Sequence, residues 1–148
     1  MSIRTALLTL LCTAALLAPA AQAQNSQDFG NYIVYYNAFT TDFLQPATAR
    51  RYGITRSKHR GMVNISVQRK RMNTVGEPVE ASITGNATNL NAQIKALNLR
   101  EIKEGNAVYY IAEFPVSNME TLDFKLQVTP KGQSTPLHVE FRQQFYTE

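Results

Sequence analysis

The chain has 148 residues, of which 15 are Lys or Arg and 11 are Asp or Glu, so its formal net charge is +4. This length fits one domain rather than several. Because Cys12 is the only cysteine and there are only two histidines, the sequence excludes an internal disulfide and a zinc site built from several thiolates.

The first 23 residues have the layout of a secretory signal. Arg4 precedes an apolar run over residues 6–17, and Ala21-Gln22-Ala23 places small residues where a signal peptidase cuts. The run is shorter than the roughly 20 residues that span a bilayer, so we expect no membrane-spanning helix. We predict cleavage after Ala23, export to the periplasm, and a single mature domain over residues 24–148 that contains no cysteine.

Period-two alternation of apolar and polar residues predicts strands along most of this domain. The expected strands are residues 32–39, 62–68, 79–85, 91–100, 107–112, 122–128 and 137–145. Residues 91–100 also fit a helix, but a strand with a slip in its phase is preferred because a hairpin follows. Tight turns are expected at residues 104–106 and 130–133, which have turn-forming sequences. The one short helical segment, residues 46–52, begins with a proline suited to a first turn.

These elements predict an all-β fold: an immunoglobulin-like antiparallel β-sandwich of about seven strands with one short helical turn. Alternation places one set of side chains from each strand in the core. We expect Ile65, Tyr109, Phe124 and Leu126 to be buried there. Large apolar side chains must supply the packing energy, because the mature domain has no disulfide to support it.

A stretch of the sequence, residues 50–71, is strongly basic and contains no carboxylate. Residues 63–67 within it alternate like a core strand, so the cations lie on both sides of that strand. From residue 72 onward there are six cations and nine carboxylates, and one interpretation is that the two groups pair across the sheet. The other interpretation is an anion-binding surface. Eight residues carry the charge: Arg50, Arg51, Arg56, Lys58, Arg60, Arg69, Lys70 and Arg71.

For the second interpretation, the best candidate surface is the first part of the stretch. If the loop before the strand is extended, Arg56, Lys58 and Arg60 point to one side. The expected partner is an anionic envelope component or an acidic periplasmic protein. Nucleic acid is not expected, since the chain is exported and lacks the usual stacking motifs. The candidate binding residues are Arg50, Arg51, Arg56, Lys58 and Arg60.

Catalytic chemistry has little support in the sequence. His59 and His138 are the only imidazoles, and the sequence spacing of Ser57 and His59 does not indicate a nucleophile and its base. Thioethers suit copper(I), but Met62, Met72 and Met119 form no close repeat. We assign no catalytic residue, no metal ligand and no cofactor.

Several motifs resemble those of an exported bacterial family, the proteins with domain of unknown function 4426. They include Tyr35-Tyr36-Asn37-Ala38-Phe39, Phe43-Leu44-Gln45-Pro46, Tyr52-Gly53-Ile54, Asn64-Ile65-Ser66-Val67 and Glu104-Gly105-Asn106-Ala107-Val108-Tyr109-Tyr110. The resemblance covers most of the mature chain. It implies an immunoglobulin-like sandwich in the periplasm and no established activity.

The functional hypothesis is therefore a non-catalytic binding or accessory module, and an enzyme is not favoured. The alternative is a periplasmic enzyme or copper carrier that uses His59 or His138. The oligomeric state and the identity of the partner are left open by the sequence.

Overall fold

The computed structural model describes residues 25–148. The predicted secretory signal and its cleavage site at Ala23 lie outside the described residues. Within residues 25–148 no helix is long and apolar enough to cross a membrane.

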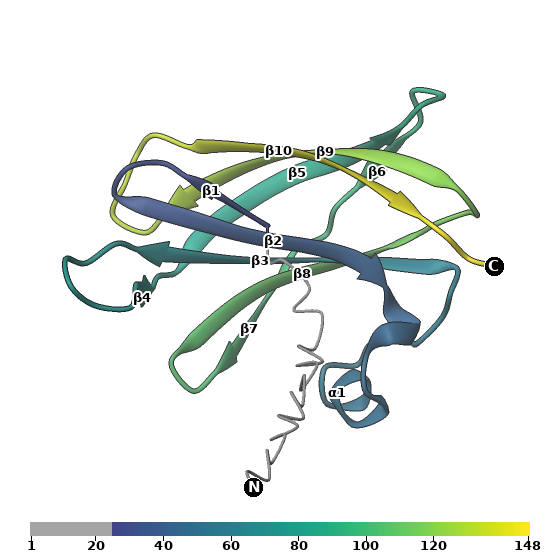
Figure 1. Cartoon of the computed structure of the whole chain (residues 1–148), viewed down its shortest axis with the longest axis horizontal. Coiled ribbons are helices and arrows are strands. Elements are labelled where there is room, and N and C mark those ends of the chain that lie inside the picture. The colour runs from purple at the N-terminus through teal and green to yellow at the C-terminus, as the bar shows by residue number, and fades with distance from the viewer. Residues whose placement is uncertain (1–24) are drawn as a thin grey trace, which may run out of the picture.

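The described chain forms two antiparallel sheets packed face to face (Figure 1). The first sheet has the order β1-β2-β3-β8-β7, with β4 paired to β3. Its strands are β1 (Asn25–Asp28), β2 (Tyr32–Thr40), β3 (Arg60–Arg69), β4 (Glu77–Pro78), β7 (Arg100–Glu104) and β8 (Ala107–Pro115). The second sheet has the order β10-β9-β5-β6. Its strands are β5 (Ala81–Asn89), β6 (Ile94–Ala96), β9 (Glu120–Pro130) and β10 (Leu137–Phe145).

This architecture confirms the predicted all-β antiparallel sandwich. Seven strands have five or more residues, and the three additional ones, β1, β4 and β6, are short. The short helix is confirmed as α1 (Pro46–Arg51), which follows a 3₁₀ turn, η1 (Thr41–Phe43). Proline is at the first helical position, where its missing N–H costs no hydrogen bond.

The prediction of one broken strand over residues 91–100 is corrected by the structure. Residues 94–96 form β6 in the second sheet, and the chain then crosses to the first sheet, where β7 begins at Arg100. The slip in the apolar pattern marks this crossing. Leu97 is buried between the sheets at the point where the chain leaves β6.

The core between the sheets is built from the alternating residues of the long strands. Phe124, Leu126 and Ile65 are buried, as predicted. Tyr109 is half-buried, and the prediction that it faces the core is wrong. Its neighbour Tyr110 is buried instead, because the β3–β8 register places it opposite Ile65.

A second, smaller hydrophobic cluster lies away from this core and joins α1 to the sheet that contains β3 and β8. It contains Ala49, Ile54, Met62 and Ile111, and Tyr52 packs against it. This cluster fixes α1 and the chain that follows it on the sheet, and so positions the basic residues 50–60.

Candidate functional site

We use the name basic loop for residues 50–60, which run from the end of α1 to the first residue of β3. Gly53 leaves the helix with φ +65°, a conformation that favours glycine. The buried hydroxyl of Thr41 donates to the Thr55 carbonyl at 2.8 Å and accepts from the Ser57 N–H at 2.9 Å. Ile54 is buried in the small cluster. Internal contacts therefore define the backbone of the basic loop.

Two of the five predicted site residues, Arg51 and Arg60, are paired with carboxylates within the protein. Arg51 Nη1 lies 3.0 Å from Glu104 Oε1, and Arg60 Nη1 lies 3.7 Å from Glu113 Oε1. The Tyr52 hydroxyl donates to the other oxygen of Glu104 at 2.5 Å. This bond to the carboxylate raises the pKa of Tyr52 above its usual value. Arg51 and Tyr52 thus attach α1 to β7.

The other three predicted site residues are exposed and have no carboxylate within 4.0 Å among residues 25–148. They are Arg50, Arg56 and Lys58. Arg56 Nη2 donates to the Asp42 carbonyl at 2.8 Å, which holds the guanidinium near η1 and leaves its other N–H groups available. The expected one-sided row of Arg56, Lys58 and Arg60 is interrupted by a turn at residues 58–59.

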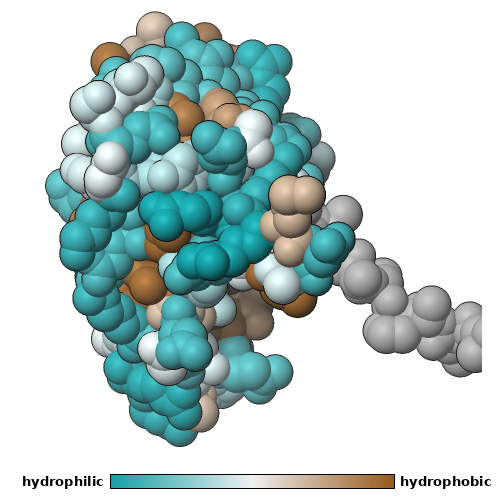
Figure 2. Space-filling view, turned by 90° about the vertical axis from the view of Figure 1, so that its left-hand side faces the viewer, coloured by the Kyte–Doolittle hydropathy of each residue, from teal (hydrophilic) through white to brown (hydrophobic). Residues whose placement is uncertain are grey.

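The remaining cations of the basic stretch are engaged inside the protein. Lys70 pairs with Asp28, and Arg71 pairs with Glu77. The Arg69 guanidinium lies 5.7 Å from the centre of the Tyr32 ring, where a cation–π contact is favourable. Figure 2 faces the end of the sandwich at which β3 ends and the chain turns toward β4. It shows a mainly hydrophilic surface with scattered hydrophobic residues. Pairing therefore accounts for part of the basic stretch, and the basic loop retains the free charge.

The two histidines lie in different parts of the fold. His59 is exposed in the turn before β3, and His138 is exposed on β10 with Glu140 on the same face. Within the described part of the chain, no group of three His, Cys, Asp or Glu side chains is arranged to hold a metal ion. Met62 is buried in the small cluster, whereas Met72 and Met119 are exposed on separate loops.

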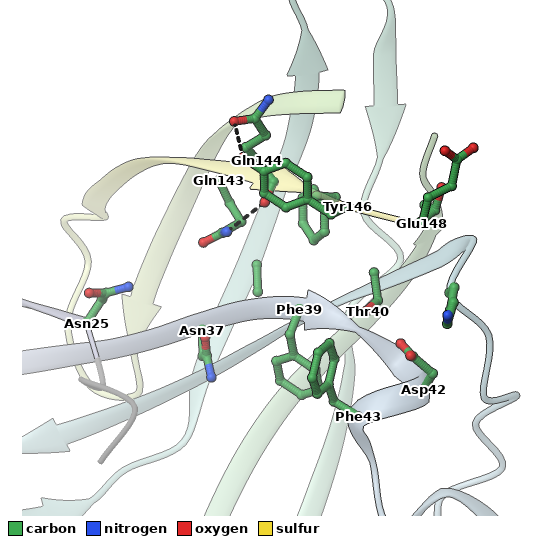
Figure 3. Close-up of a pocket in the computed structure, with 14 residues that line it drawn as sticks. Asn25, Asn37, Phe39, Thr40, Asp42, Phe43, Gln143, Gln144, Tyr146 and Glu148 are labelled. Carbon is green, nitrogen blue, oxygen red and sulfur yellow. Dashed lines mark hydrogen bonds between the residues drawn. The ribbon is translucent and has the colours of Figure 1, made fainter. Parts of the chain in front are cut away.

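A groove of about 580 Å³ separates the second half of β2 from the second half of β10 (Figure 3). We call it the edge groove. Residues 37–40 of β2 form one wall and residues 143–148 of β10 and the following segment form the other; Asn25, Asp42, Phe43 and Lys58 complete the lining. Nothing in the pattern of residues predicts this groove. Among residues 25–148, β1 pairs with β2 only over residues 33–36 of β2, and alternation along one strand carries no signal for where a neighbouring strand pairs.

A smaller cavity of about 240 Å³ lies between α1 and the outer face of β3 and β8. Its walls are mostly apolar and include Leu44, Ile54 and Met62. The Asn64 Oδ1 atom at this cavity is buried and has no hydrogen-bond partner among the described residues. The cavity belongs to the packing of α1, and we assign it no ligand.

Comparison with known proteins agrees with this architecture. The family model of domain of unknown function 4426 (DUF4426) matches residues 26–148. A crystal structure of a DUF4426 family protein from Pseudomonas aeruginosa PAO1 is similar, with 36% identity and a TM-score of 0.75, covering 86% of this chain and 98% of that chain. No match is found among curated proteins.

Two structures of FetP from a uropathogenic Escherichia coli strain share the fold at low identity. As-isolated FetP has 9% identity and a TM-score of 0.59, covering 83% of this chain and 93% of FetP. A copper-bound FetP variant has 10% identity and a TM-score of 0.60, covering 83% and 95% of the two chains. At this level of identity the likeness concerns the fold alone.

Proposed function

Since the chain belongs to the DUF4426 family, whose name assigns no activity, we propose that it acts as a non-catalytic binding module whose basic loop contacts an anionic partner in the periplasm. The partner is an anionic envelope component or an acidic protein. The observation that carries the proposal is the group of exposed cations Arg50, Arg56 and Lys58, which have no carboxylate partner among the described residues.

The physical support comes from the contrast within the basic stretch. Five of its cations are engaged with Glu104, Glu113, Asp28, Glu77 or the Tyr32 ring. Three positive charges without carboxylate partners among the described residues, on a loop whose backbone is fixed, attract anions with little ordering cost. Arg50 and Arg56 add guanidinium groups, which bind carboxylate or phosphate through two N–H groups.

Periplasmic export is the part of the proposal that the first 23 residues support. The exported protein is expected to begin at Gln24 after the loss of Met1 to Ala23. Intact-mass measurement of the protein recovered from a periplasmic extract tests this. Recovery of mainly full-length protein from the cytoplasm would contradict it.

The binding proposal is tested by removing the three free charges together. Replacing Arg50, Arg56 and Lys58 by glutamine is expected to abolish binding to vesicles containing phosphatidylglycerol or to immobilised polyglutamate, whichever the wild-type domain binds. The free energy of unfolding should change by less than about 1 kcal/mol, as for other exposed charges. Wild-type binding should also weaken as salt rises, because ions screen exposed charges beyond about 8 to 10 Å.

A matched control removes three exposed cations that have internal partners: Lys70, Arg71 and Lys131. This second triple glutamine variant has the same net charge as the first and should retain binding. Equal loss in both variants would indicate a response to net charge alone and would overturn the proposed site. Strong destabilisation of the first variant would assign Arg50, Arg56 and Lys58 to the fold instead.

The alternative, a periplasmic enzyme or a copper carrier using His59 or His138, gains no specific support from these contacts. One imidazole lies in the turn before β3 and the other on β10, and the copper in the FetP variant belongs to a protein of 10% identity. Metal analysis of the purified domain and of a variant that lacks both histidines would test it directly.

A further inference from the structure

The edge groove follows a part of β2 that has no strand partner on its outer side. β1 pairs with residues 33–36, beginning with Asn25 opposite Tyr36, whereas β3 pairs with β2 as far as Thr40. Among the described residues, the outer edge of β2 is therefore unpaired over residues 37–40. Every second residue of such an edge turns its N–H and C=O outward, and these groups form a template for another strand.

The opposite wall of the groove is the second half of β10. Among the described strands β10 pairs only with β9. Near the middle of β10 the space next to β2 is occupied by β1, since Gln27 Nε2 donates to the Glu140 carbonyl at 2.8 Å. The edge groove thus continues the line of the described part of β1 beyond Asn25 (Figure 3).

The size of the groove matches a short strand. A residue in a packed sheet occupies roughly 160 Å³, taking a rise of about 3.4 Å, a strand spacing of about 4.8 Å and a sheet spacing of about 10 Å. The groove of about 580 Å³ then has room for about four residues. Four is also the number of unpaired β2 positions, residues 37–40.

The side chains around the groove are of the kind that peptides contact. Two exposed aromatic residues lie at the groove, Phe43 with 72% and Tyr146 with 60% of its surface accessible, and aromatic residues are enriched in binding surfaces. Asn37 of β2 and Gln143 of β10 are among the residues that line the groove. The Asn37 carboxamide lies on the side of β2 that faces away from β10 (Figure 3). A carboxamide both donates and accepts hydrogen bonds, as a peptide group requires.

At one end of the groove lies a carboxylate oxygen, Asp42 Oδ1, that accepts no hydrogen bond from the described residues. Asp42 is half-buried, and its Oδ1 atom is buried without a hydrogen-bond partner among the described residues. Glu148 lies at the same end, with Lys58 as the only cation in the lining. An unpaired buried carboxylate oxygen is costly, so a ligand that brings a cationic donor to this end is favoured.

From these observations we infer that the edge groove binds an extended segment of a partner polypeptide. About four residues of the segment add as a strand to the outer edge of β2, between β2 and β10, with a Lys or Arg near Asp42. Main-chain hydrogen bonds then provide affinity and alternate side chains provide specificity, as in other cases of strand addition. This inference does not depend on the function proposed for the basic loop.

The test begins with selection from a random octapeptide phage library on the mature domain. We expect enrichment of extended sequences that alternate apolar and polar residues and contain one Lys or Arg. A synthetic peptide of the selected sequence is then titrated into labelled domain and followed by NMR. Amides within residues 37–40 are expected to become protected from exchange, with resonance shifts also at residues 143–146.

Variants define the site in the same titration. The double variant Phe43→Ala, Tyr146→Ala should weaken peptide binding at least tenfold. The control Leu90→Ala, Ile94→Ala, in which 71% and 70% of the wild-type side-chain surfaces are exposed on another hairpin, should bind as the wild type does. Asp42→Asn should reduce affinity for the basic peptide and have little effect on an analogue with norleucine at the basic position.

Several results would overturn the inference. These are a library that yields no enriched peptide, a selected peptide that binds the groove variant and the control equally, and resonance shifts that lie outside the groove. Shifts of groove resonances by soluble peptidoglycan oligosaccharides, with none by peptides, would identify a glycan site and would likewise contradict strand addition.

Discussion

Replacing Phe124 with alanine is expected to lower the free energy of unfolding by about 3 to 5 kcal/mol, the usual cost of emptying an aromatic core position. Phe124 is 1% exposed. Its ring stacks on Phe141 at 4.5 Å and meets the edge of Phe114 at 5.5 Å between centroids. The residue therefore links the two sheets, since Phe141 and Phe124 belong to one sheet and Phe114 to the other.

Phe43→Ala is the matched control, because the same atoms are removed from a ring that is largely exposed. It should change the free energy of unfolding by less than about 0.5 kcal/mol. Denaturant unfolding of both variants at neutral pH makes the comparison. Similar losses in the two would contradict the assignment of Phe124 to the core, and a small loss for Phe124→Ala would do the same.

The parts of the fold that the sequence predicts are those in which a local pattern is sufficient. In β9, Leu122, Phe124, Leu126 and Val128 alternate with polar residues, and all four are buried. A half-buried strand imposes this period of two on any sequence that forms it. The helix α1 was predicted for a similar reason, since proline fixes where a helix can begin.

The errors occur where the arrangement of strands in space decides the outcome. Residues 91–100 have apolar side chains suited to burial, but their pattern does not say that the chain changes sheets after β6. The edge groove likewise depends on which strands become neighbours and on which residues of β2 the described part of β1 pairs with. Pairing partners and sheet order are non-local properties, so alternation along one strand does not encode them.

The basic stretch was predicted as a feature, but its division into paired and free cations was not. Arg51 and Arg60 find carboxylates on β7 and β8, far from them in sequence. Composition shows that nine carboxylates follow residue 72. Only the tertiary structure shows which cations reach them, and thus that the free charge lies on Arg50, Arg56 and Lys58.

The two adjacent tyrosines of β8 show the same limit at a single position. Alternation requires Tyr109 and Tyr110 to occupy opposite faces, but both faces of β8 contact apolar residues, so the sequence does not distinguish them. The structure buries Tyr110. Its hydroxyl donates to Glu101 at 2.9 Å and accepts from the Ala81 N–H at 2.8 Å, which connects β8 and β7 with the first residue of β5 in the other sheet.

Tyr110→Phe is accordingly expected to lower the free energy of unfolding by about 1 to 3 kcal/mol, because it leaves the Ala81 N–H and the Glu101 carboxylate without their partner. The neighbouring change Tyr109→Phe provides the control. Its hydroxyl makes no hydrogen bond among the described residues, so the expected loss is below about 0.5 kcal/mol. Urea unfolding at neutral pH separates the two.

The pH dependence gives a second, independent measurement of the same hydroxyl. Burial, with Glu101 nearby, raises the pKa of Tyr110 to about 12, although the hydrogen bond from Ala81 opposes this. An unfolded tyrosine ionises near pH 10, so the folded state holds the proton more tightly. The stabilisation is then complete below about pH 10 and is lost as the pH rises from 10 through 12.

Tyr110→Phe should unfold with a smaller loss of stability over that interval than the wild type, whereas Tyr109→Phe should follow the wild type. Equal alkaline slopes in the wild type and Tyr110→Phe would contradict the raised pKa of this hydroxyl.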